Sequence, residues 1–497
     1  MSNSLLTLLV VLGSGVGQQP VLQFPERPIW VEEKCGSGRI VGFDTDGDQR
    51  ADYWQRVDAS GRKVELRICL AADEPNETVL LDETGPGQVP HFIIALDGVP
   101  YALVEELYRK NCFRLFYPPS RVVTCFPGMT NPAFQRIFGG EKPVAYESSY
   151  FDRQKNRPLG GSDTYLNGQA ATWTEILDYR CAFELDALCY IKPTVVFAQE
   201  LQQMMDVFRR AQGGTKIAYC AATAGLGTRG GKEAILGYLR TIDRLCEQIV
   251  YEKRGKVRIS LLADHGHSSS GQGRVSFAKQ LKRNGYRLTD RLERTGDVVT
   301  VEFGLVTYAA YYTEDPAGVA TVLLKDPATT LACYPIAKND QTTSGSGVVV
   351  QSASGKAIIE KRQDRFRYKI EYGDPLELLG IITQLRQKEK VDSDDFIDDE
   401  ALLAATFNHT YPDPLRRIWL AFNGLVQKPA DLIVCLKDEY VHGNSLFYKV
   451  IGKVASTHGS LNQANSTTFA MTMMGELPLA MRLEEVMPAL EKLHGDR

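Results

Sequence analysis

The chain has 497 residues, of which 43% are hydrophobic, so it can bury more than one small core. Its 57 basic residues nearly balance 61 acidic residues. This balance argues against the strongly basic surface typical of proteins that bind nucleic acid polymers or anionic membranes. Composition predicts a globular protein with a large main domain and an insertion or a smaller partner domain.

Residues 1–17 combine an apolar run, Leu5 to Leu12, with the small residues Gly15 to Gly17. This pattern is typical of a secretory signal peptide and predicts a secreted or periplasmic protein. No Lys or Arg precedes the run, so an uncleaved anchor and an ordinary buried strand stay open as alternatives. The run is too short for a transmembrane helix, and no transmembrane domain is predicted.

Residues 27–85 read as short strands and turns, which predicts a β-rich appendage. One loop in it places carboxylates at alternate positions, with a backbone carbonyl as a further oxygen ligand: Asp44, Asp46, Asp48 and Asp52, and the carbonyl of Arg50. That spacing suits Ca²⁺. The carboxylate expected at the twelfth position of an EF-hand is replaced by Gln55, and a solvated Asp/Gly turn is the alternative.

From residue 90 to residue 295 strands and helices alternate. Buried strands are predicted at 91–96, 216–222 and 257–262, and helices at 103–110 and 232–252. Strand, helix and strand in succession predict an α/β fold with a largely parallel sheet sandwiched by helices.

Residues 296–375 are again strand-rich and punctuated by Gly/Ser/Thr segments, so we expect an inserted β-rich subdomain that borders the site. Residues 376–497 return to the main domain after a charged connector. A helix is predicted at 414–422, and strands at 431–436 and 467–473.

Candidate site residues follow the predicted strands. Asp97 and the pair Asp264-His265 come at strand ends, where carboxylates and imidazoles face the ligand crevice of a parallel sheet. Thr130 lies at the mouth of a predicted helix that Pro132 favours, so its hydroxyl faces unpaired N–H groups suited to a phosphate or sulfate.

Four short segments in this order resemble the alkaline phosphatase superfamily, in particular its type I phosphodiesterase/nucleotide pyrophosphatase-like branch. They are Asp97-Gly98, the segment from Pro127 to Pro132, Asp264-His265-Gly266 and Thr457-His458-Gly459. The resemblance spans residues 90 to 480. It implies two zinc ions about 4 Å apart and a Thr130 nucleophile that forms a covalent phospho-threonine. It implies one ion held by Asp97, Thr130, Asp264 and His265, and a second ion held partly by His458.

The second ion's site departs from the family pattern. Where the family has Asp and His in an Asp-x-x-x-His loop, this chain has Ala224 and Thr228. An Ala offers no ligand atom and a Thr hydroxyl is a poor one, so this second site is degenerate. His267 is the nearest residue that could rebuild it, with His442 and Asp163 as weaker candidates. A one-metal mechanism with Arg229 as a fixed charge stays open.

The sequence therefore predicts a metal-dependent hydrolase-like protein that acts on small phosphoric mono- or diesters through Thr130. The alternative is a catalytically impaired relative that binds a phosphorylated or sulfated ligand, or a partner protein, in the same crevice. A sulfatase-like or phosphoglycerate-mutase-like activity is a further alternative, since fold does not fix substrate.

Overall fold

The structure is a computed structural model that describes residues 29–44, 49–61, 63–68, 77–80, 89–161, 172–182, 185, 188–269, 273–336 and 347–495. The predicted signal peptide, residues 1–17, lies outside these ranges, as do Asp46 and Asp48 of the predicted calcium loop. The fold is mixed α/β, as predicted. Within the described ranges, every helix is too short or too polar to cross a membrane.

The main sheet has six strands in the order β10-β6-β11-β26-β7-β27. Only β26 runs against its neighbours β11 and β7. The central strands β6 and β11 are buried along their whole length, which suits strands covered on both faces. The strands are β6 (His91–Leu96), β7 (Ser120–Val123), β10 (Thr215–Cys220), β11 (Arg258–Ala263), β26 (Thr467–Thr472) and β27 (Ala480–Arg482).

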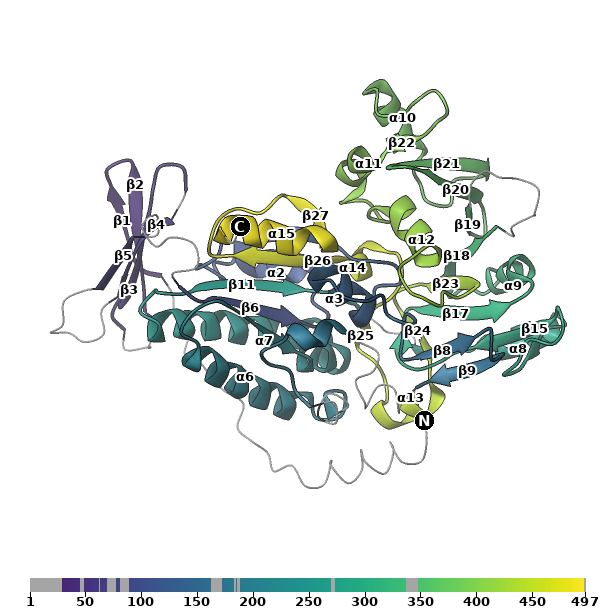
Figure 1. The fold of residues 1–497 in the computed structure, drawn as a ribbon, viewed down its shortest axis with the longest axis horizontal. Helices are drawn as coiled ribbons and strands as arrows, with labels where there is room; N and C mark the ends of the chain where they lie inside the picture. Colours follow the sequence, from purple (N-terminus) through teal and green to yellow (C-terminus); the bar gives the residue numbers. More distant parts are fainter. Residues whose placement is uncertain are drawn as a thin grey trace.

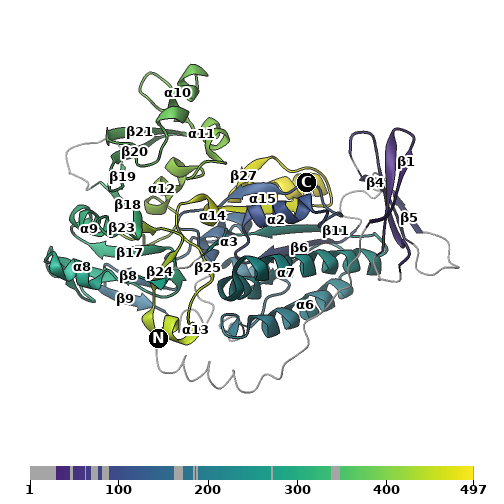
Figure 2. The same cartoon turned by 180° about the vertical axis from the view of Figure 1, so that it is seen from behind.

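Helices flank this sheet on both sides. α2 packs against α7, and α3 packs against α15; the two pairs lie on opposite sides of the sheet (Figures 1 and 2). α6 packs against α7 and β10. α7 is kinked at Gly231, whose φ of 60° is not helical. The helices are α2 (Tyr101–Arg109), α3 (Thr130–Phe138), α6 (Pro193–Arg210), α7 (Ala222–Glu252) and α15 (Leu483–His494).

An antiparallel sheet of five strands lies at the N-terminal end of the described chain (Figure 1). Phe43, Tyr53 and Leu66 from this sheet belong to the same hydrophobic core as the main sheet. The guanidinium of Arg114 lies 4.9 Å from the ring centre of Phe43. The small sheet is therefore packed onto the main domain. Its strands are β1 (Ile29–Cys35), β2 (Gly38–Phe43), β3 (Tyr53–Val57), β4 (Lys63–Ile68) and β5 (Glu77–Leu80).

A second large sheet has nine strands in the order β14-β15-β17-β23-β18-β19-β20-β21-β22. It extends beyond the predicted range 296–375 at both ends. β23, assigned by sequence to the main domain, lies between β17 and β18, because a buried strand pattern does not reveal which sheet the strand joins. The strands are β14 (Arg287–Leu288), β15 (Asp297–Thr300), β17 (Tyr308–Thr313), β18 (Thr329–Pro335), β19 (Val348–Gln351), β20 (Lys356–Arg362), β21 (Arg365–Tyr372), β22 (Ile397–Asp398) and β23 (Leu432–Leu436).

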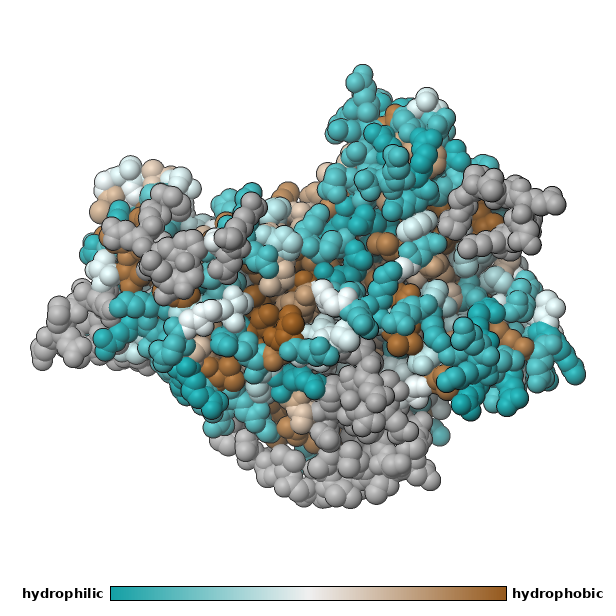
Figure 3. Space-filling model, in the orientation of Figure 1, coloured by the Kyte–Doolittle hydropathy of each residue, from teal (hydrophilic) through white to brown (hydrophobic). Residues whose placement is uncertain are grey.

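Shorter strands and helices complete the fold. The surface over two of these helices, α10 and α11, is largely hydrophilic (Figure 3). The short strands are β8 (Ser149–Asp152), β9 (Arg157–Gly160), β12 (Ser268–Ser269), β13 (Gly273–Arg274), β16 (Leu305–Val306), β24 (Tyr440–Gly443) and β25 (Ser456–Thr457). The helices are η1 (Thr172–Ile176), α8 (Ala278–Arg283), α9 (Pro316–Leu323), α10 (Leu379–Gln387), α11 (Asp399–Thr406), α12 (Pro414–Phe422), α13 (Ser445–Ile451) and α14 (Gln463–Ser466).

Candidate metal centre

Two aspartates directly follow the ends of adjacent parallel strands of the main sheet. β6 and β11 pair in parallel with Leu96 opposite Ala263, so Asp97 and Asp264 are the next residues on adjacent strands. Both side chains are buried. Oδ1 of Asp264 accepts hydrogen bonds from the N–H groups of Gly98 and His265, each at 2.9 Å. These bonds fix the carboxylate and leave its Oδ2 facing the ring of His265.

The ring of His265 presents a lone pair to these carboxylates. Its Nδ1 lies 3.0 Å from the carbonyl oxygen of Gly266. A carbonyl only accepts, so the neutral ring carries its proton on Nδ1 and a lone pair on Nε2. Nε2 lies 3.2 Å from Oδ2 of Asp264 and 3.5 Å from Oδ1 of Asp97. Three electron-rich atoms converge, and a cation between them removes their mutual repulsion.

Burial sets the protonation of this group in the absence of a cation. Desolvation raises the pKa of Asp264 to about 7 and lowers the pKa of His265 to about 4. The interior therefore disfavours both a lone carboxylate and an imidazolium. A divalent cation reverses the penalty for the carboxylates, because it supplies the opposite charge at contact distance.

The hydroxyl of Thr130 contacts the same group. It is the first residue of α3, and its Oγ1 lies 3.5 Å from Oδ2 of Asp97 and 3.5 Å from Nε2 of His265. The helix begins two residues earlier than Pro132 suggested, after the N-cap residue Met129. The four residues predicted for the first ion, Asp97, Thr130, Asp264 and His265, are thus brought together. We call them the carboxylate site.

Two further imidazoles lie beside His265. β12 pairs with β25, so that Ser268 is opposite Thr457, which brings His267 next to His458. The ring centroids of His265 and His458 are 3.8 Å apart, and those of His267 and His458 are 5.3 Å apart. One ligand nitrogen from each of the three rings lies within 4.8 Å of the others. We call His265, His267 and His458 the imidazole site.

Hydrogen bonds orient both added rings with Nε2 inward. Nδ1 of His458 lies 2.8 Å from the carbonyl oxygen of Gly128, so it donates. Nδ1 of His267 lies 2.9 Å from Oγ of Ser456, whose hydroxyl donates to the carbonyl of Gly227 at 2.7 Å. Oγ of Ser456 therefore accepts from His267. Hydrogen bonds of this kind to the outer ring nitrogen are typical of metal-binding histidines.

Tyr219 and Thr223 support Asp97, and sequence reasoning missed both. The hydroxyl of Tyr219 donates to Oδ2 of Asp97 at 2.5 Å, and its ring packs edge-on against Phe134 and Trp173. The backbone N–H of Asp97 donates to Oγ1 of Thr223 at 2.8 Å. Tyr219 lies in β10, the parallel neighbour of β6, but a tyrosine inside a strand carries no sequence signal for this role.

Ala224 and Thr228 lie in a helix, whereas the sequence suggested a loop. Both are buried in the first part of α7. The carbonyl of Thr228 accepts from the N–H of Ala455 at 2.8 Å. Arg229, considered as a replacement charge, is exposed.

The other candidates have different surroundings. Nε2 of His442 lies 3.3 Å from Oε1 of Glu302, and its ring stacks on Phe277, so it is not part of the imidazole site. Asp163 lies outside the described residues. Of the predicted calcium loop, Asp44 and Asp52 are buried.

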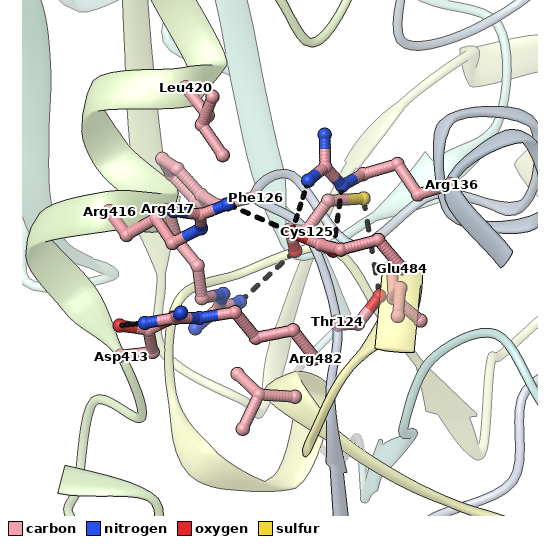
Figure 4. A pocket seen from close by; sticks show the side chains of 12 residues that line it. Thr124, Cys125, Phe126, Arg136, Asp413, Arg416, Arg417, Leu420, Arg482 and Glu484 are labelled. Atoms are coloured by element: carbon pink, nitrogen blue, oxygen red, sulfur yellow. Dashed lines mark hydrogen bonds and ion pairs between the residues drawn. The ribbon is translucent and has the colours of Figure 1, made fainter. Parts of the chain in front are cut away.

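Cys125 is another candidate nucleophile, and it lines a pocket whose lining includes no residue of the imidazole or carboxylate site (Figure 4). Its Sγ donates to the carbonyl of Pro127 at 3.3 Å, and burial raises the pKa of the thiol, so it is a poor nucleophile. Three of the pocket's arginines, Arg136, Arg416 and Arg482, pair with acidic neighbours. The fourth, Arg417, is buried and donates to the backbone carbonyls of Pro412, Leu461 and Cys125.

No protein-family model and no curated protein sequence matches the chain. Among solved structures, human ectonucleotide pyrophosphatase/phosphodiesterase 5 is similar, with a TM-score of 0.45 and 11% sequence identity. The match covers 81% of this chain and 94% of that chain. The similarity is distant, so the chemistry of the centre rests on the chain's own residues.

Proposed function

We propose that this protein is a metal-dependent hydrolase of small phosphoric mono- or diesters, with Thr130 as the nucleophile. The observation that supports this most is the convergence of one hydroxyl, two buried carboxylates and one imidazole lone pair within 3.5 Å contacts. Such a group is not explained by stability, because burying acceptors against one another is unfavourable.

The donor set fits zinc. Asp97 and Asp264 offer carboxylate oxygens and His265 offers a nitrogen, all within 4.8 Å of one another. Oxygen and nitrogen donors with an open position are typical of catalytic zinc. When bound, the ion would lower the pKa of the Thr130 hydroxyl and neutralise charge on the phosphoryl oxygens.

The chain's own groups provide the rest. The first-turn N–H groups of α3 have no side-chain cap, so they and the positive end of the helix favour an incoming phosphoryl group. Oδ2 of Asp97 is 3.5 Å from the Thr130 hydroxyl and is placed to accept its proton. The new Oγ1–P bond replaces the ester O–P bond, and the alcohol leaves. Water then cleaves the phospho-threonine and releases phosphate or a phosphomonoester.

The proposed partner is a small phosphorylated molecule, not a nucleic acid polymer. We also propose that the protein is secreted or periplasmic, and that it consists of a β-rich appendage, a main domain and an inserted subdomain. The alternative function is a binding protein that holds a phosphorylated or sulfated ligand at the same residues without turnover.

Thr130→Ala tests the nucleophile, and Thr130→Ser is the matched control that keeps a hydroxyl. With zinc present, both are assayed on p-nitrophenyl phosphate and bis(p-nitrophenyl) phosphate. We expect Thr130→Ala to lose turnover by about 10³-fold or more, and Thr130→Ser to retain a measurable rate. Acid-quenched wild type should carry phosphate on Thr130 by mass spectrometry. Equal turnover of wild type and Thr130→Ala would contradict the proposal, and ligand binding without any turnover would favour the binding protein.

A further inference from the structure

His267 has no role in the carboxylate site, yet its position is that of a ligand. The side chain is buried, and its Nε2 has no hydrogen-bond partner among the described residues. A buried imidazole nitrogen left unpaired is unfavourable by about 1–3 kcal/mol. Its other nitrogen, Nδ1, is held by Ser456, so Nε2 is the nitrogen left for a ligand. The unpaired atom thus points into a group of potential metal ligands.

The space beside His267 is also shaped for this ring. Gly98 has φ +68°, and a Cβ there would lie 2.4 Å from Nε2 of His267. A Cβ on Gly227 would lie 3.2 Å from its Nδ1. Glycine on both sides therefore leaves room for the imidazole at the point where it meets the centre.

Charge separates the imidazole site from the carboxylate site. Asp97 and Asp264 can balance the two positive charges of one divalent ion. His267 and His458 are neutral ligands; among the described residues their group contains no carboxylate, and it meets Asp97 and Asp264 only through His265. A divalent ion held by them therefore keeps most of its charge, which favours an anionic ligand in its open position.

We propose that Nε2 of His267 and Nε2 of His458 bind a second divalent transition-metal ion, and that an oxyanion bound at the centre is needed to retain it. Imidazole nitrogens select zinc, copper or nickel over magnesium or calcium. Binding of the second ion and binding of phosphate then strengthen each other by the same factor. This inference rests on the proposed function, because the oxyanion is its product.

Zinc per chain tests the inference without any assay of activity. Protein equilibrated with buffered zinc is analysed by elemental analysis, with and without inorganic phosphate. Wild type should hold two zinc ions with phosphate and close to one without it, and phosphate should tighten the second ion at least tenfold, within the usual range of about 5- to 150-fold coupling. His267→Asn places an amide donor near the position of Nδ1, where Ser456 bonds it, but it lacks Nε2, so it should hold one ion in both conditions.

His442→Ala is the matched control, because it removes a buried histidine outside the centre, and it should behave as wild type. Cobalt provides a second readout: the visible bands of the second equivalent should be absent in His267→Asn. Identical zinc content and phosphate dependence in wild type and His267→Asn would overturn the inference, as would one ion in wild type with phosphate. If phosphate still appears on Thr130 in that case, only the second ion is wrong and the proposed function stands.

Discussion

Tyr219→Phe tests how much the hydrogen bond from Tyr219 to Asp97 contributes to stability and to zinc binding. The substitution removes one donor from Oδ2 of Asp97, at 2.5 Å, and keeps the ring that packs against Phe134 and Trp173. Tyr238→Phe is the matched control: its hydroxyl is buried in the same domain without a hydrogen-bond partner. The two variants lose the same atom from different surroundings.

The expected magnitudes follow from those surroundings. A hydrogen bond to a charged acceptor contributes about 1.5–3 kcal/mol, so Tyr219→Phe should lower the free energy of unfolding of the zinc-free protein by that amount. Tyr238→Phe should be neutral or slightly stabilising, because it removes an unsatisfied buried group. Tyr219 also orients a ligand carboxylate, so its loss should weaken zinc binding by about 10- to 100-fold.

Two assays check this. Chemical denaturation in the presence of a chelator gives the difference in stability between the variants, and zinc titration against a competing chelator gives the affinity. If both variants unfold at the same denaturant concentration and bind zinc equally well, Asp97 does not depend on Tyr219 and the account of the site is wrong.

Three further predictions concern Glu200, Gly98 and the predicted calcium loop. Burial raises the pKa of Glu200 to about 7, above its ordinary value near 4.5. The folded protein therefore binds this proton more tightly than the unfolded chain, and the free energy of unfolding should fall by roughly 3 kcal/mol as pH rises from about 4.5 to 7. Denaturation across this pH range should show a flatter fall in Glu200→Gln, and an equal slope would refute the assignment. Gly98→Ala should destabilise the protein more than Gly36→Ala. Both glycines have positive φ, which alone contributes about 1–2 kcal/mol on substitution, but only a Cβ at Gly98 would meet His267, whereas a Cβ at Gly36 would have no described atom within 4 Å. Equal shifts in melting temperature would contradict this difference. If the predicted loop binds Ca²⁺, calcium at 100 times its Kd should stabilise the wild type by about 2.7 kcal/mol and leave Asp46→Ala unchanged; no calcium-dependent shift in wild-type melting would leave the solvated turn as the better interpretation.

The proximity of Asp97, Thr130, Asp264 and His265 could be predicted from sequence because it depends on local features. Leu96 and Ala263 each end a fully buried run, and parallel strands bring such ends to one edge of the sheet. The residue after each strand is therefore placed by the strand itself. Thr130 has a different local signal: Pro132 favours a helix start, which predicts Thr130 at the mouth of α3.

The helical start of α7 could not be predicted in this way. Residues 221–231 are rich in Gly and Ala and read as a loop, but their first N–H groups are satisfied from a distant element. Both carboxylate oxygens of Glu200, in α6, accept from the N–H groups of Ala221 and Ala222 at 3.0 Å. A buried carboxylate here takes the place of a local cap, and its role is invisible in the segment it stabilises.

His267 is an intermediate case, because its position could be predicted from sequence but its orientation could not. Its spacing from the Asp-His pair marked it as a candidate, but the direction of its lone pair depends on Ser456 and, through it, on the carbonyl of Gly227. That chain of hydrogen bonds joins three segments far apart in sequence. Only the structure shows that the ring faces the centre.

Anomalous diffraction at the zinc edge, from crystals grown with zinc, shows whether the carboxylate site binds a metal ion. We expect a peak within coordination distance of Asp97, Asp264 and Nε2 of His265, next to the Thr130 hydroxyl. No peak at this point, with the side chains unchanged and zinc present in the crystal, would contradict the assignment of the centre as a metal site.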